Sequence, residues 1–156
     1  MNSFARLSRL LLAAFLVVVA ACDKSVTAPR IADAEVKEII LRTSSGDIIY
    51  SHIDHWHGAP LAPLGGFETL EIFFSSVRMS ADDHDPPPFE SWFTLADHPE
   101  LSIIAIVEDP AVGSWTGTRV AGQLHGLAAG ASRLSFVVRR GTTTLLEAPP
   151  LNFRVQ

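Results

Sequence analysis

Apolar and polar residues alternate in short runs along most of the chain. Residues 69–76 (TLEIFFSS) are typical, because Leu70, Ile72 and Phe74 occupy every second position. Successive side chains of a β strand point to opposite faces, so this two-residue period predicts a strand with one buried face. No comparable run follows the helical period, and the chain is therefore expected to be all-β.

Glycine and proline clusters separate these runs and are expected to form turns. Residues 32–40 would accept a helix on propensity, but the run that follows favours a strand beginning near Val36 and ending in a turn at residues 44–47. The remaining expected strands cover residues 47–54, 69–76, 89–95, 102–108, part of 114–124, 131–139, 142–146 and 151–155. Many short strands with frequent turns predict an antiparallel sandwich or barrel. Arg140 and Gly141 are expected to close a hairpin.

The N-terminal segment follows a different pattern. Arg6 and Arg9 precede an unbroken apolar run at residues 10–19 (LLLAAFLVVV). A transmembrane helix needs about 20 apolar residues, so this run is too short to span a bilayer comfortably. A basic start, a short apolar stretch and small residues at its end are typical of a signal peptide, predicted here to be residues 1–21.

The apolar run ends in Val19-Ala20-Ala21-Cys22, which contains the only cysteine of the chain. This order resembles the lipobox of bacterial lipoproteins, in which an aliphatic residue and two small residues precede a cysteine. The resemblance implies that Cys22 receives a diacylglyceryl group and becomes the new N-terminus. The protein is then expected to be a membrane-anchored lipoprotein that faces the periplasm or the cell exterior. The alternative is an ordinary secretory signal cut after Ala21.

Three segments follow from this reading. Residues 1–21 are the expected signal peptide, residues 22–34 a polar tether, and residues 35–156 a single β-sandwich domain. The single cysteine permits no disulfide within the chain. It also excludes a zinc site built on several thiolates.

Charge and motifs exclude several classes of function. The whole chain has a net charge of −5, and removal of the signal peptide takes away two of its 12 basic residues but none of its 17 acidic ones. Nucleic-acid binding needs a basic surface, so no nucleic-acid partner is expected. The sequence also lacks the common hydrolase, zinc-protease and phosphate-loop motifs. A non-enzymatic role is therefore expected.

Two stretches in the C-terminal half resemble bacterial Ig-like domains. They are residues 101–107 (LSIIAIV) and residues 120–138 (VAGQLHGLAAGASRLSFVV), in which glycines, alanines and alternating apolar residues take the places of the family's pattern. The resemblance implies an Ig-like antiparallel β-sandwich of about seven strands. A Gly-x-x-x-Gly piece is expected to turn the chain between two strands, with an apolar residue between the glycines that plugs the end of the sandwich.

The N-terminal half carries a stretch that ordinary modules of that family lack. Residues 51–57 (SHIDHWH) hold half of the chain's six histidines. On one continuous strand, His55 and His57 would share a face, with His52 and Asp54 on the other. Neutral imidazoles two residues apart can bind one metal ion such as zinc. A further ligand is expected from His52 or from residues 81–85 (ADDHD), which contain His84.

Two functions remain open at this point. The first is a lipid-anchored, non-enzymatic module of the cell envelope that binds a protein, a glycan or envelope material. The second is an exported protein that binds zinc or a similar divalent metal through His52, His55, His57 and His84. In a purely structural alternative, Trp56 is a core residue and the histidines beside it are rim residues that hydrogen-bond the turn. His98 and His125 are interpreted as loop residues.

Overall fold

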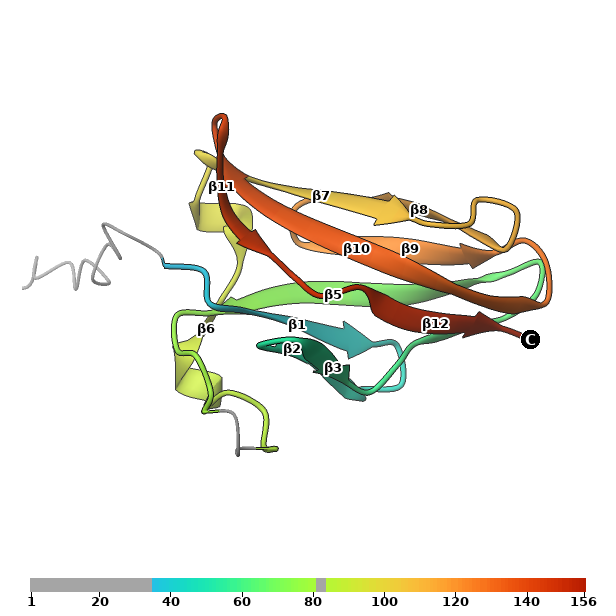
Figure 1. Cartoon of the computed structure of the whole chain (residues 1–156), viewed down its shortest axis with the longest axis horizontal. Helices are drawn as coiled ribbons and strands as arrows, with labels where there is room; N and C mark the ends of the chain where they lie inside the picture. The colour runs from blue at the N-terminus through green and yellow to red at the C-terminus, as the bar shows by residue number, and fades with distance from the viewer. Residues whose placement is uncertain (1–34, 81–83) are drawn as a thin grey trace, which may run out of the picture. The chain divides into compact units, whose positions relative to one another are not determined.

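The expected strands pair into two sheets that pack face to face. The computed structural model describes residues 35–80 and 84–156, which form an all-β sandwich (Figure 1). This confirms the predicted fold class. The described residues contain twelve strands, whereas the resemblance implied about seven and the alternating runs predicted nine. Residues 114–124 form two strands, and the short strands His55–His57 and Leu61–Ala62 were not foreseen.

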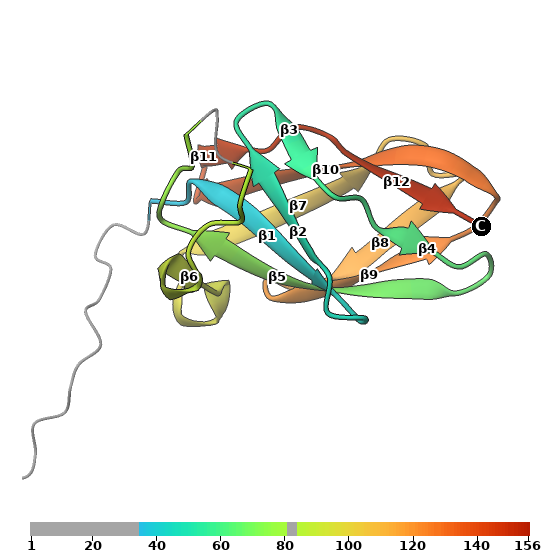
Figure 2. The ribbon, with the colours of Figure 1, turned by 90° about the horizontal axis from the view of Figure 1, so that it is seen from below.

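The first sheet runs in the order β3-β2-β1-β5-β9-β8, with β6 paired to the other end of β5, and all its pairings are antiparallel. Figure 2 shows β1, β2, β3 and β5 in front. Its strands are β1 (Glu38–Thr43), β2 (Ile48–His52), β3 (His55–His57), β5 (Phe67–Ser75), β6 (Trp92–Phe93), β8 (Gly113–Gly117) and β9 (Ala121–Gly126).

The second sheet runs in the order β11-β10-β12-β4, with β7 on the opposite edge of β10. The pairing of β12 with β4 is parallel and the others are antiparallel. Its strands are β4 (Leu61–Ala62), β7 (Leu101–Val107), β10 (Gly130–Arg140), β11 (Thr143–Glu147) and β12 (Leu151–Val155). The long β10 is therefore the centre of this sheet.

The core lies between the inward faces of the two sheets. The alternation predicted for residues 69–76 is confirmed, since Leu70, Ile72 and Phe74 are buried and face inward from β5. The second sheet contributes the same pattern from β10 and β12. The fully buried side chains of those two strands are Leu134, Phe136, Val138, Leu151 and Phe153.

Two expected turns are confirmed. Residues 44–47 join β1 to β2, and Gly141, with φ of +57°, lies in the turn between β10 and β11. Such a positive φ favours glycine because it has no Cβ. At the start of the domain, where a helix was the alternative for residues 32–40, the described residues form the strand β1.

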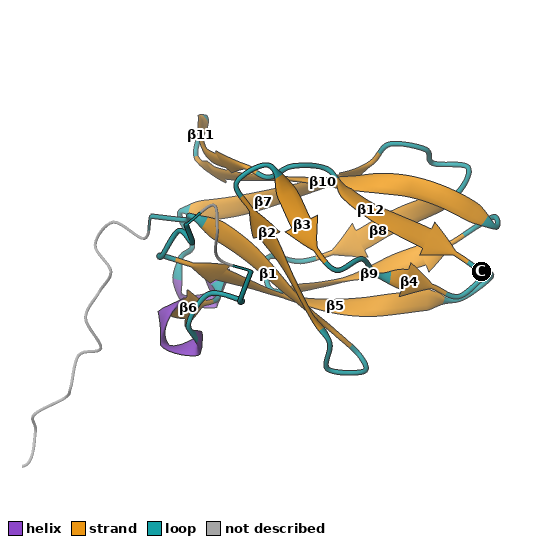
Figure 3. Cartoon of the chain, turned by 60° about the horizontal axis from the view of Figure 1, so that its bottom comes forward, coloured by secondary structure: helices purple, strands orange, loops and turns teal. Residues whose placement is uncertain are grey.

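Two expected strands are wrong in detail. Residues 89–95 form 3₁₀ turns at Phe89–Ser91 and Leu95–Asp97 around the two-residue β6 (Figure 3), because the preceding prolines donate no ladder hydrogen bonds. Residues 114–124 form a hairpin of β8 and β9 instead of one strand. The indole of Trp115 occupies the space beside Gly122, where a Cβ would lie 2.0 Å from its Cζ2 atom.

The glycine-rich stretch is only partly as expected. Gly126 ends β9 and Gly130 begins β10, so the piece between them does turn the chain. The apolar residue in it does not plug the sandwich, because Leu127 is 55% exposed. His125 lies on β9 and not in a loop, whereas His98 follows a 3₁₀ turn as expected. The resemblance to Ig-like domains stays a prediction of the sequence.

The expected signal peptide, Cys22 and the tether of residues 22–34 lie outside the described residues. Within the described part, no helix is long and apolar enough to cross a membrane.

A matched pair of phenylalanine substitutions tests the core. Phe136 is fully buried and its ring lies 5.7 Å from that of Trp115 and 6.0 Å from that of Trp56. Phe136→Ala should therefore lower the free energy of unfolding by about 3–5 kcal/mol in urea titrations. Phe89→Ala is the control, because Phe89 is 74% exposed, and should change it by no more than about 0.5 kcal/mol. Equal effects of the two substitutions would contradict this placement of the core.

Candidate functional site

The histidine stretch folds into a hairpin and not into one strand. β2 ends at His52, Ile53 and Asp54 form a two-residue turn, and β3 begins at His55. The register pairs His52 with His55 and Tyr50 with His57 across the two strands. Directly paired residues point to the same side of a sheet, so His52, His55 and His57 share one face. The expectation that His52 faces away from the other two is therefore wrong.

Trp56 faces the opposite way, into the sandwich. Its ring packs against the core and lies 6.0 Å from that of Phe136, while its Nε1–H donates to the carbonyl oxygen of Pro149. Trp56 is therefore partly buried against the core, as the structural alternative had it. Because side chains alternate along a strand, an inward Trp56 places His55 and His57 on the outer face of the sheet.

Residues on both sides of the gap at 81–83 contact this outer face. The Nε2 atom of His52 lies 2.8 Å from the carbonyl oxygen of Ser80, and the hydroxyl of Tyr50 donates to the carbonyl oxygen of His84. As a result, His52 is only 1% exposed although it lies outside the main core. His57 is half-buried and His55 is exposed, so the three imidazoles run from the interior to the surface.

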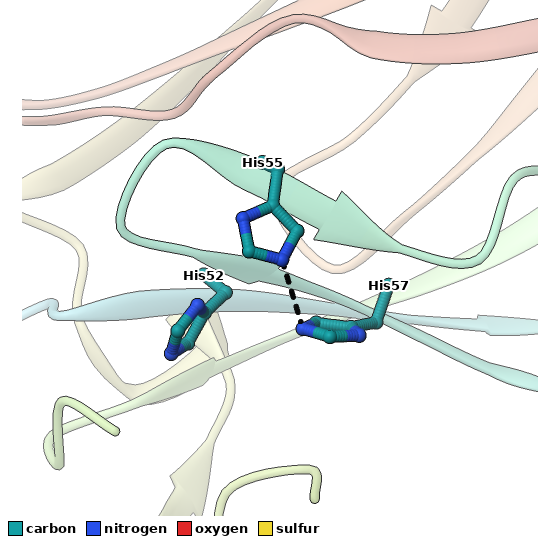
Figure 4. A group of neighbouring side chains, drawn as sticks. All are labelled: His52, His55 and His57. Carbon is teal, nitrogen blue, oxygen red and sulfur yellow. Dashed lines mark hydrogen bonds between the residues drawn. The ribbon is translucent and has the colours of Figure 1, made fainter. Parts of the chain in front are cut away.

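The three imidazoles converge (Figure 4). One ligand nitrogen from each of His52, His55 and His57 lies within 4.8 Å of those of the other two. The Nε2 atoms of His55 and His57 are 3.1 Å apart. Two nitrogens bound tetrahedrally to zinc at about 2.0–2.1 Å lie roughly 3.3 Å apart, so this spacing fits a shared metal ion within a few tenths of an ångström.

Hydrogen bonds set which nitrogen each imidazole offers. A carbonyl oxygen only accepts, so His52 must carry its proton on Nε2 when it bonds Ser80. Its Nδ1 then has a lone pair, and this buried atom has no hydrogen-bond partner in the described structure. His55 donates from Nδ1 to Oδ1 of Asp54 at 2.8 Å, which leaves its Nε2 as the acceptor. A carboxylate that holds the far nitrogen of a histidine is typical of metal sites.

Electrostatics keep the cluster ready to bind a cation. Burial lowers the pKa of His57 below its ordinary value of 6.5, and the nearby imidazoles His55, His84 and His52 lower it further. His57 is therefore neutral at neutral pH, and a neutral imidazole is the form that binds metal. The hydrogen bond from His55 lowers the pKa of Asp54, so this carboxyl stays ionised beside the cluster.

Of the expected acidic loop, only His84 and Asp85 lie within the described residues. Asp82 and Asp83 lie outside the described residues. The ring of His84 lies 5.3 Å from that of His57, but His84 does not belong to the group of three that share the 4.8 Å spacing. His84 therefore lies at the edge of the histidine cluster and not within it.

A buried carboxyl lies beside the cluster. Oε2 of Glu38 accepts from the hydroxyl of Ser51 at 3.0 Å, and that hydroxyl accepts from the backbone N–H of Ile39 at 2.8 Å. The other oxygen, Oε1, is buried and has no hydrogen-bond partner among the described residues. Burial raises the pKa of Glu38, while Ser51, Arg78 and His52 act in the opposite direction.

Sequence reasoning missed the residues that position the histidines. Tyr50 stacks on His57 with ring centroids 4.6 Å apart and an interplanar angle of 14°. Its place two residues before His52 could have shown that it shares their face. Nothing in the sequence indicates the contact of the Ser80 carbonyl with His52, because that contact depends on the path of a loop.

Comparisons with models of protein families, with curated proteins and with solved structures find no match to this chain. Any function of the chain must therefore be inferred from its own residues and their geometry.

The buried carboxyl predicts a pH dependence of stability. Because the folded state raises the pKa of Glu38 above 4.5, the folded protein keeps a proton that the unfolded chain has lost. The free energy of unfolding should therefore fall, relative to that of Glu38→Gln, as the pH rises above 4.5. Urea titrations from pH 4.5 to neutral pH measure this difference. Glu90→Gln, at an exposed position, is the control. The hypothesis fails if the wild type and Glu38→Gln have parallel stability curves.

Proposed function

We propose that the protein is a lipid-anchored metal-binding protein of the cell envelope and that His52, His55 and His57 hold a zinc-like divalent cation. The observation that carries this proposal is the convergence of three ligand nitrogens within 4.8 Å, one each from His52, His55 and His57. The Nδ1 atom of His52 is also buried and has no hydrogen-bond partner among the described residues, so it has a lone pair to offer. A buried polar atom without a partner lowers stability by about 1–3 kcal/mol. Bound metal would remove that penalty.

The donor set favours a borderline metal ion. All three ligands are imidazole nitrogens, which suit zinc, copper and nickel better than calcium or magnesium. Asp54 supports zinc further, because it holds His55 in the tautomer that leaves Nε2 available. Zinc is the metal proposed here, and copper and nickel are the comparison ions in the titration.

The proposed location depends on the sequence alone. The resemblance of residues 19–22 to a lipobox supports export, lipid attachment at Cys22 and a membrane partner. The proposal assigns the protein a binding role and no catalytic one. Binding of a protein, glycan or envelope material by the sandwich stays a prediction of the sequence. No site among the described residues favours it over metal binding.

Calorimetric titration of the purified protein with Zn²⁺ tests the metal site. The wild type should bind one equivalent of zinc, and His55→Ala/His57→Ala should lose binding. The expected loss exceeds the roughly 10- to 100-fold that follows removal of an outer-shell partner, because two direct ligands are removed. Bound zinc should also raise the midpoint of thermal unfolding, since a ligand of the folded state stabilises it.

His125→Ala is the matched control. His125 lies on β9, away from the cluster, and its Nε2 atom is 3.0 Å from the hydroxyl oxygen of Thr116 on β8. The substitution therefore removes a histidine without removing a proposed ligand. Zinc binding of equal strength in the wild type and in His55→Ala/His57→Ala would contradict the proposal.

Cell fractionation tests the anchor. In a bacterial host, the wild type should sediment with membranes and incorporate labelled fatty acid, because several acyl chains on one cysteine form a stable anchor. Cys22→Ser should lose the label and leave the membrane fraction. A Cys22→Ser protein that still carried label, or stayed with the membranes after signal cleavage, would refute lipidation at this residue.

A further inference from the structure

A fourth imidazole lies at the edge of the cluster but comes from another part of the chain. His84 belongs to the connection between β5 and β6, and its ring centroid is 5.3 Å from that of His57 at an interplanar angle of 62°. The same centroid distances within the group of three are 4.7, 5.1 and 5.6 Å. His84 is therefore as close to His57 as the three proposed ligands are to one another.

Tyr50 links His84 to the cluster by two contacts. Its ring stacks on His57, and its hydroxyl donates to the backbone carbonyl oxygen of His84. Tyr50 is buried, so this single side chain fixes the backbone of His84 relative to His57. The side chain of His84 itself is exposed. It can change rotamer without displacing any core residue.

The number of ligands that zinc binds bears on the role of His84. Structural zinc sites have four protein ligands in a tetrahedron, whereas catalytic sites have three and keep water in the fourth position. His52, His55 and His57 supply three nitrogens. His84 is the nearest further imidazole and has its backbone already fixed at the site.

We infer that His84 is the fourth ligand and that its side chain rotates onto the metal to close an all-histidine tetrahedral site. This inference rests on the proposed metal binding. A closed site holds its ion and leaves no position for an activated water, so it suits retention of the metal and not hydrolysis. Tyr50 is then a positioning residue, since it touches two of the ligands but not the metal.

X-ray absorption of the untagged, zinc-loaded full chain tests this directly. The wild type should show four imidazole nitrogens and no oxygen ligand. His84→Ala should still bind zinc through the other three histidines and should show three imidazoles and one oxygen. Its affinity should fall by more than the roughly 10- to 100-fold that follows loss of an outer-shell partner, because a direct ligand is removed. Cobalt substitution gives a second reading, because the visible spectrum of the ion changes when water replaces a nitrogen ligand.

His98→Ala is the matched control. Its imidazole also lies edge-on to an aromatic ring, with its centroid 5.4 Å from that of Phe93. His98 follows the 3₁₀ turn at Leu95–Asp97 and belongs to neither β2 nor β3. Its spectrum should equal that of the wild type. Three imidazoles and one oxygen in the wild type would overturn the role of His84 and leave the three-histidine site intact. An unchanged spectrum in His84→Ala would overturn it equally. Absence of zinc binding in the wild type would instead refute the proposed function itself.

Discussion

The anchoring of Trp56 in the core determines the arrangement of the whole histidine face. Its indole packs near Phe136 and donates to the carbonyl oxygen of Pro149, so it ties the β2–β3 hairpin to the opposite sheet. Because successive side chains of a strand point to opposite faces, an inward Trp56 requires His55 and His57 to point outward. The packing of Trp56 in the sandwich and the outward placement of the histidines therefore have the same cause, the alternation of side chains along β3.

The same end of the sheet accepts an unusual amount of buried polarity. Glu38, Ser51 and His52 are all buried, and two of their polar atoms lack hydrogen-bond partners among the described residues. Buried polar groups without partners destabilise a fold, and they tend to occur where a site uses them. The same strands contribute Ile39, Leu41 and Ile49 to the apolar core, which continues into β5, β10 and β12. The buried polar groups and the apolar core thus share strands β1 and β2.

Sequence patterns predicted the fold well where local alternation decides the structure. The strands with one buried face, such as β5 and β12, follow directly from the period of their apolar residues. The prediction failed where a turn lacks its usual residues. Ile53 and Asp54 form a hairpin turn without the Asn-Gly or Asp-Gly pair that marks one. The expected strand therefore ran through this turn to Asp54, and the faces of residues 52–57 were assigned as on one continuous strand. That one turn moved His52 onto the face of the other histidines. Contacts made by the connection after β5 had no signal in the sequence, because they depend on tertiary packing.

The pairing of β12 with strands from distant parts of the chain has a consequence for how the protein assembles. This strand pairs with β10 on one side and with β4, from far earlier in the chain, on the other. Pairings between distant segments form slowly, because the intervening chain must first be brought together. The carbonyl that receives the indole of Trp56 also belongs to Pro149, just before β12. During synthesis, the β2–β3 hairpin emerges long before Pro149 does. The histidines therefore acquire their native spacing late, only after β12 has joined its sheet and the indole of Trp56 has found its acceptor.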